Sequence, residues 1–176
     1  MEYEESYFKK QANKNTLLMW TTLNVIFTVL YILEMIKGGR TPQYLAVFLS
    51  LCWIPYLIGL IVLKIKGFDT PIYCEIVSAG YGLLYFFVLM TTKTNVTYGY
   101  IFPVASLLVL YKKRKLLIRW GILNILILLA YLIKNNFHDI TDAEIQIGVT
   151  LLCYVAYDIA IRHMTRTEEA MLGSVK

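Results

Sequence analysis

The residues in this sequence that could act as catalytic groups or metal ligands are few and stand apart from one another. There are two histidines, His138 and His163, and no cluster of acidic residues near either has the spacing of a metal site. The sequence contains no GxSxG, Walker or HExxH motif, so an activated serine, a phosphate-binding loop and a zinc-protease helix are all missing. We therefore expect no enzymatic activity, no bound metal and no cofactor.

Polar side chains inside apolar segments are the next candidates, because a polar group in lipid is costly and usually faces the interior of a helix bundle. Asn24 and Asn124 could contact a ligand, or they could form hydrogen bonds between helices. Tyr56 and Tyr157 are further candidate ligand-binding residues, because an internal repeat described below places them at equivalent positions.

Glu75 completes the set of candidate ligand-binding residues. It follows Thr70 and Pro71, which are typical of the N-cap and first turn of a helix. A carboxylate in that position interacts favourably with the positive end of the helix. Glu75 could therefore serve the helix itself rather than a ligand.

The composition is that of an integral membrane protein. Of the 176 residues 58% are apolar and only 16% are charged, and the mean hydropathy is +0.58. The net charge of +5 could suggest nucleic acid, but the basic residues fall at the ends of apolar runs, which indicates lipid headgroups instead. Cys52, Cys74 and Cys153 lack metal-site spacing and are expected to be buried in apolar segments.

Six apolar segments predict an all-helical bundle of six transmembrane helices. Residues 1–15 form an interfacial N-terminal segment, residues 16–163 the membrane domain, and residues 164–176 the start of a cytoplasmic output helix. The fourth segment is short, so it must thin the bilayer or lie deep in the bundle. The expected spans are 16–36, 44–63, 72–92, 96–111, 116–133 and 144–161.

The distribution of Lys and Arg predicts the orientation of these spans. With the N-terminus inside, thirteen of the 17 basic residues lie on the inner side, and four, Lys37, Arg40, Lys93 and Lys134, lie on the outer side. Six spans then place both termini in the cytoplasm of a multi-pass plasma-membrane protein. No cleavage site follows the first apolar run, so we expect the first span to be retained.

The chain also shows internal repetition. A shift of 100 residues aligns Asn24 with Asn124, and a shift of 101 aligns Tyr56 with Tyr157. The spacing from Pro55 to Lys64 returns from Pro103 to Lys112, and each proline is expected to bend its helix and free a backbone carbonyl. Three tandem helical hairpins of roughly 50 residues would explain these matches. Chance similarity between leucine-rich helices is the alternative.

The end of the last span is where a signal could leave the membrane. Asp158 precedes Arg162 by four residues, which predicts a local ion pair rather than a proton relay. Ile161 and Met164 then begin an apolar seam that continues through Met171 and Val175 as the chain becomes polar. We assign signal transmission to this helix, through Asp158, Ile161, Arg162 and Met164.

Three stretches resemble one known family. Together with the tail AMLGSVK, they are similar to the N-terminal six-span region of clostridial methyl-accepting chemotaxis proteins. The stretches are CWIPYLIGLIVLKIKGFDTPIYCEIVSAGYGLLYFFVLMTT, IFPVASLLVLYKKRKLLIRWGILNILI and EIQIGVTLLCYVAYDIAI. The resemblance implies a sensory and anchoring input domain that forms a homodimer within the lipid bilayer. In that family the tail continues into a cytoplasmic coiled coil that engages a histidine kinase and its adaptor.

This sequence stops at Lys176, where the signalling part would start, so it is either a fragment of such a receptor or a free-standing relative. Binding of the kinase and adaptor would need the missing C-terminal part. A small transporter or channel built from repeated hairpins is the first alternative function, and an integral membrane enzyme is the second.

Overall fold

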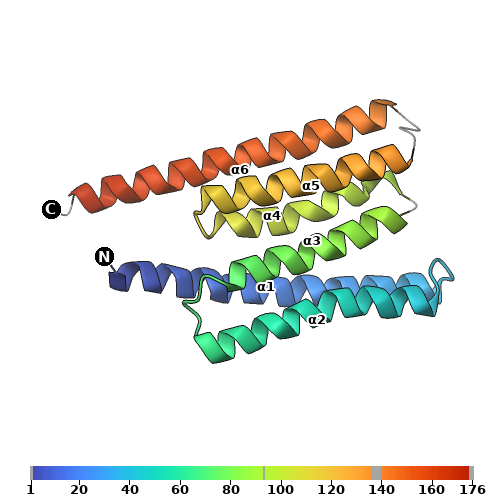
Figure 1. The fold of residues 1–176 in the computed structure, drawn as a ribbon, viewed down its shortest axis with the longest axis horizontal. Helices are drawn as coiled ribbons and strands as arrows, with labels where there is room; N and C mark the ends of the chain where they lie inside the picture. Colours follow the sequence, from blue (N-terminus) through green and yellow to red (C-terminus); the bar gives the residue numbers. More distant parts are fainter. Residues whose placement is uncertain (1, 93, 136–139, 175–176) are drawn as a thin grey trace. The chain divides into compact units, whose positions relative to one another are not determined.

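The computed structural model of this chain describes residues 2–92, 94–135 and 140–174, and these residues form helices and short connections without any strand. The chain divides into two compact units, one ending at Val88 and the other beginning at Leu89. Figure 1 labels the helices, which are α1 (Glu2–Ile36), α2 (Pro42–Lys66), α3 (Tyr73–Thr91), the 3₁₀ helix η1 (Asn95–Ile101), α4 (Phe102–Val109), α5 (Arg114–Lys134) and α6 (Ile140–Ser174).

Five of these helices are long and apolar enough to cross a membrane. They are α1, α2, α3, α5 and α6. The prediction of an all-helical, multi-pass membrane protein is thus confirmed. The fourth apolar segment is shorter, and it combines η1 with α4.

In the first unit, α1 and α2 form an antiparallel hairpin, and both ends of its connection have clear local causes (Figure 1). Gly38 takes the left-handed φ of 75° after α1, a conformation that glycine adopts without a steric penalty. Thr41 then caps α2, because its hydroxyl accepts a hydrogen bond from the N–H of Tyr44, and Pro42 occupies the first turn. The chain therefore reverses within a few residues.

The core of the first unit is aromatic. Trp20 of α1 and Tyr73 of α3 are 2% and 0% exposed, and their ring centroids lie 6.2 Å apart. Gly59 of α2 faces both rings, since a Cβ atom there would lie 2.9 Å from Cε2 of Tyr73 and 3.1 Å from Cζ3 of Trp20. Glycine at this position lets α2 pack closely against the two large side chains.

A second close approach in this unit involves Pro55 of α2, which lies within an uninterrupted helix. A Cβ atom at Gly80 of α3 would lie only 2.5 Å from Cβ of Pro55 and 3.4 Å from Cζ2 of Trp20. The proline ring thus packs directly against a position where only hydrogen fits. This contact gives Pro55 a packing role between α2 and α3.

In the second unit, α4, α5 and α6 pack against one another, and α5 and α6 are antiparallel neighbours (Figure 1). The fourth apolar segment has a buried side, on which Ile101, Val104, Ala105, Leu107 and Leu108 are each at most 3% exposed. We expected this segment either to thin the bilayer or to lie deep in the bundle. Its burial agrees with the second expectation.

Pro103 explains the i to i+3 hydrogen bond at the end of η1. Proline has no N–H to give to the carbonyl four residues earlier, which is that of Gly99. That carbonyl accepts a hydrogen bond from the N–H of Phe102 instead, in the i to i+3 pattern of a 3₁₀ helix. The carbonyl that we expected Pro103 to free is therefore satisfied locally.

Two predicted boundaries fall inside continuous helices. α1 begins at Glu2, so residues 2–15 of the predicted N-terminal segment continue into the first span as one helix of 35 residues. α6 runs without a break from Ile140 to Ser174, across the expected boundary between residues 163 and 164. Four residues that figure in the sequence analysis lie outside the described residues, namely Lys93, His138, Val175 and Lys176.

The predicted hairpins correspond only in part to the compact units. The first hairpin, α1 with α2, lies in the first unit, and the third hairpin, α5 with α6, lies in the second. Most of α3 belongs to the first unit and α4 belongs to the second, so the expected middle hairpin is divided between them. Three residues of α3 explain why it packs with the first hairpin: Tyr73, Gly80 and Tyr81 contact Trp20, Pro55 and Phe27, respectively.

The contact of Gly80 with Pro55 predicts a steric effect on stability. Gly80→Ala should lower the unfolding free energy by about 1–3 kcal/mol, because the added methyl group overpacks the interface between α2 and α3. Gly148→Ala in α6 is the matched control, since nothing lies within 4 Å of its added Cβ atom. Thermal unfolding in detergent should show a lower midpoint for the first variant only. Equal midpoints would contradict the close approach.

Candidate functional site

A three-residue ion cluster connects α5 to α6 in the second unit. Nε of Arg114 lies 2.6 Å from Oδ1 of Asp158, and Nη2 of Arg114 lies 3.5 Å from Oδ2. Nη2 of Arg162 lies 2.6 Å from Oδ2 of the same carboxylate. The side chain of Asp158 is only 16% exposed, whereas those of Arg114 and Arg162 are 55% and 51% exposed. The protein thus shields the carboxylate more than either guanidinium group.

The turn between α4 and α5 places Arg114 in this cluster. Successive i to i+3 hydrogen bonds end α4, from the N–H groups of Leu110, Tyr111 and Lys112. Lys112 has a φ of 52°, which lies in the left-handed region that non-glycine residues seldom adopt. The chain therefore turns sharply, and Arg114 becomes the first residue of α5 beside α6.

The structure contains the predicted ion pair between Asp158 and Arg162, one turn apart on α6. The sequence analysis missed Arg114, because it lies 44 residues from Asp158 and on another helix. One signal could have suggested the pairing. No Asp or Glu occurs between Glu75 and Asp139, so the basic run that starts at Lys112 has no acidic partner near it in sequence.

Asn24 and Asn124 both form hydrogen bonds between helices. Nδ2 of Asn24 donates to the carbonyl oxygen of Cys52 on α2 at 3.0 Å. Nδ2 of Asn124 donates to the hydroxyl of Tyr154 on α6 at 2.7 Å. Each asparagine therefore joins the first helix of its hairpin to the second. Of the two roles considered for these asparagines, the described contacts show the hydrogen bonds between helices.

The amide oxygens of these two asparagines have a different environment. Asn24 is fully buried and Asn124 is 4% exposed, and Oδ1 of each has no hydrogen-bond partner among the described residues. An unsatisfied buried acceptor costs free energy, so such an atom is a suitable place for a water molecule or another hydrogen-bond donor. Asn24 belongs to the first unit and Asn124 to the second.

Tyr56 and Tyr157 bond to different kinds of partner. The hydroxyl of Tyr56 lies 2.8 Å from Oγ1 of Thr21, across the α1–α2 hairpin. The hydroxyl of Tyr157 donates to the carbonyl oxygen of Phe102 at 3.3 Å, where η1 meets α4. Tyr157 therefore connects α6 to the fourth apolar segment, immediately before Asp158 in the chain.

Glu75 lies in the first turn of α3 and is half-buried. The preceding segment is held by Thr70, whose hydroxyl accepts a hydrogen bond of 3.4 Å from the N–H of Ile72. The N–H of Glu75 itself bonds the carbonyl oxygen of Ile72. This placement near the positive end of α3 is the one that the sequence predicted.

The remaining signal-transmission candidates, Ile161 and Met164, lie on α6. Ile161 is 2% exposed and Met164 is half-buried, so Ile161 is already packed within the chain. An intermolecular seam through Ile161 would require that packing to open. The described residues contain no group of three His, Cys, Asp or Glu side chains that could hold a metal ion.

Comparisons with protein-family models, curated proteins and solved structures give no match to this chain.

The ion cluster predicts measurable coupling between α5 and α6. In a double-mutant cycle, Asp158→Asn and Arg114→Gln should show a coupling free energy of about 1 kcal/mol, because their charged hydrogen bond is partly shielded. The pair Asp158→Asn and Arg166→Gln serves as the control and should show none. Unfolding free energies measured at low and high salt would test this. Coupling that is absent at low salt would contradict the geometry.

Proposed function

We propose that this chain is the sensory and anchoring input domain of a chemoreceptor-like signal transducer in the plasma membrane. The proposal depends on one observation above all, the connection of α6 to α5 at Asp158. α6 is a single helix of 35 residues, and Asp158 joins it to Arg114 at the start of α5. A helix that extends beyond its apolar part and is bonded to its neighbour is suited to pass a displacement along its axis.

In this mechanism a stimulus in the membrane, or at its outer face, changes the packing of the spans. A shift of α5 displaces Arg114, and the carboxylate of Asp158 carries that displacement to α6. Tyr157 adds a second connection, from α6 to the carbonyl oxygen of Phe102. The tail beyond Arg162 transmits the movement to a cytoplasmic output. For this to happen, the stimulus must bind one packing arrangement of the spans more tightly than the other.

The proposed topology has six spans with both termini in the cytoplasm. It is supported by the distribution of basic residues, thirteen inside against four outside. It is also supported by the length of the fourth segment. Seven residues in 3₁₀ geometry and eight in α geometry extend about 26 Å, whereas fifteen α-helical residues extend only about 22 Å. The longer value approaches the hydrocarbon thickness of about 30 Å.

The resemblance to chemotaxis proteins adds the partners of this proposal. A cytoplasmic coiled-coil output needs paired helices, so the input domain would act as a homodimer. The histidine kinase and its adaptor would engage a part that follows Lys176.

A small transporter is the second candidate function. The observation that favours it is the pair of buried amide oxygens of Asn24 and Asn124, which lack partners among the described residues. Such acceptors could bind a transported donor or cation, and a flux measurement in proteoliposomes would reveal it.

The six-span topology predicts that the fourth segment separates two labelling sites. Thr94→Cys should react with a membrane-impermeant maleimide from outside intact cells, and Lys113→Cys only after the membrane is opened, because both sites are exposed. Lys37→Cys in the turn between α1 and α2 is the control for the outer side. Labelling of Thr94→Cys and Lys113→Cys from the same side would rule out a fourth span.

The signalling role predicts that output depends on the rotational phase of α6. The chain is joined after Lys176 to the cytoplasmic part of a chemotaxis receptor, and kinase autophosphorylation is measured in vesicles containing kinase and adaptor. Two alanines inserted after Thr165 rotate the tail by about 200° and should change kinase activity about fivefold or more, whereas four alanines nearly restore the phase.

The same insertions between Gly38 and Gly39 are the control, because this turn lies outside α6. They should leave kinase activity unchanged. If none of the insertions in α6 changes the kinase activity, transmission through this helix is refuted.

A further inference from the structure

Five basic residues surround the start of α5. They are Lys112, Lys113, Arg114, Lys115 and Arg119. The sequence analysis expected the basic residues to be spread over the ends of the apolar runs. These five residues concentrate positive charge at one end of α5, which is apolar enough to span the membrane.

Other basic segments of the chain have acidic residues close by in sequence. Lys9, Lys10 and Lys14 follow Glu2, Glu4 and Glu5, and Lys64 and Lys66 are followed by Asp69. One carboxylate paired near the start of α5 is Asp158, which bonds Arg114 and is shared with Arg162. Among the described residues, no carboxylate lies within ion-pair distance of Lys113 or Lys115. This excess positive charge calls for an anionic partner.

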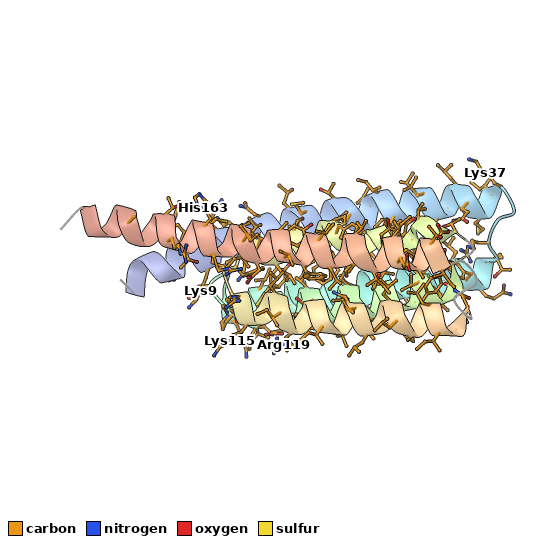
Figure 2. All side chains as sticks on the ribbon, turned by 90° about the horizontal axis from the view of Figure 1, so that it is seen from above. Lys9, Lys37, Lys115, Arg119 and His163 are labelled. Carbon is orange, nitrogen blue, oxygen red and sulfur yellow. The ribbon has the colours of Figure 1, made fainter. Side chains whose placement is uncertain are left out.

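The exposed face of α5 continues from charge into hydrocarbon. Lys115, Arg119, Ile122, Leu126 and Ile133 share one face, because their spacings of three, four and seven residues follow the helical period. Ile122 and Leu126 are each 56% exposed, and Ile133 is 62% exposed. Figure 2 shows the side chains of Lys115 and Arg119 projecting outward from α5. We call these five residues the α5 basic face, and the exposed Lys113 lies immediately before α5 begins.

We propose that the α5 basic face binds an anionic phospholipid, with the headgroup phosphate at Lys113, Lys115 and Arg119 and an acyl chain along Ile122 and Leu126. Basic clusters beside a transmembrane helix attract anionic lipids. The guanidinium of Arg119 can bond phosphate oxygens in a fixed geometry, and its central carbon lies 6.0 Å from the ring centroid of Trp120. The apolar continuation of the face favours a lipid over a free phosphate ion.

This site is independent of the proposed sensory function. It requires only that α5 lies in the membrane with its first turn at the headgroup level, whatever the protein does there. Loss of lipid preference would therefore leave the kinase and labelling experiments intact, and their failure would not affect lipid binding.

Native mass spectrometry of the purified full chain tests the proposal directly. The chain is mixed with equal amounts of dioleoyl phosphatidylglycerol and dioleoyl phosphatidylcholine in detergent, and the bound fraction of each lipid is counted. We expect one tightly bound phosphatidylglycerol. The variant Lys113→Gln with Lys115→Gln should lower its bound fraction about tenfold, because two favourable charges are removed.

Lys64→Gln with Lys66→Gln is the matched control, since it removes two exposed lysines with the same spacing at the end of α2. It should leave binding within about twofold of the parent. Arg119→Lys should retain more phosphatidylglycerol than Arg119→Gln, which separates a loss of charge from a failure to fold. Inorganic phosphate at millimolar concentration should not displace the lipid.

Three results would overturn the proposal. Equal losses in the two double variants would mean that only the net charge matters. Equal binding of phosphatidylglycerol and phosphatidylcholine would show that the headgroup charge is not recognised. Displacement by inorganic phosphate would identify a soluble anion as the ligand instead.

Discussion

The absence of water from the bilayer interior is the constraint on which the rest of this structure depends. Every backbone N–H and C=O group within the hydrocarbon must find its partner inside the protein, and helices achieve this along the chain. Where proline removes a donor, the solution is local, as when the carbonyl of Gly99 accepts the N–H of Phe102. Polar side chains obey the same rule, so Asn24 and Asn124 reach across to neighbouring helices. Association then depends on close packing, which Gly59 and Gly80 permit.

Much of this architecture could be predicted from the sequence, because long apolar segments have few structural options in lipid. Five segments are long helices, and Glu75 lies in the first turn of α3 as predicted, whereas the carbonyl that Pro103 was expected to free is bonded to the N–H of Phe102. The continuity of α1 and α6 across the ends of their apolar parts could not be predicted in this way. Polar residues 1–15 and 164–174 are compatible with helix, and hydropathy records only where the apolar part stops. The placement of α3 in the first unit and α4 in the second could also not be predicted, because it depends on contacts of large side chains and glycines that are distant in sequence.

The candidate site shows the same division. The pair of Asp158 with Arg162 follows from a spacing of four residues, whereas the bond to Arg114 depends on a sharp turn at Lys112. Lysines and arginines that are adjacent in sequence then have different surroundings. Arg114 is directed to a carboxylate on α6, while Lys115 and Arg119 lie on the outward face of α5. Sequence composition does not distinguish these basic residues, whereas their positions around α5 do.

The fourth apolar segment differs from the long helices in a mechanical sense. A residue in 3₁₀ geometry advances the chain about 0.5 Å farther than one in α geometry. Conversion of the seven residues of η1 to α geometry would shorten the segment by about 3.5 Å. Biological membranes differ in hydrocarbon thickness by a similar amount. In the proposed six-span topology, the segment therefore contains a length reserve that would let it shorten in a thinner bilayer.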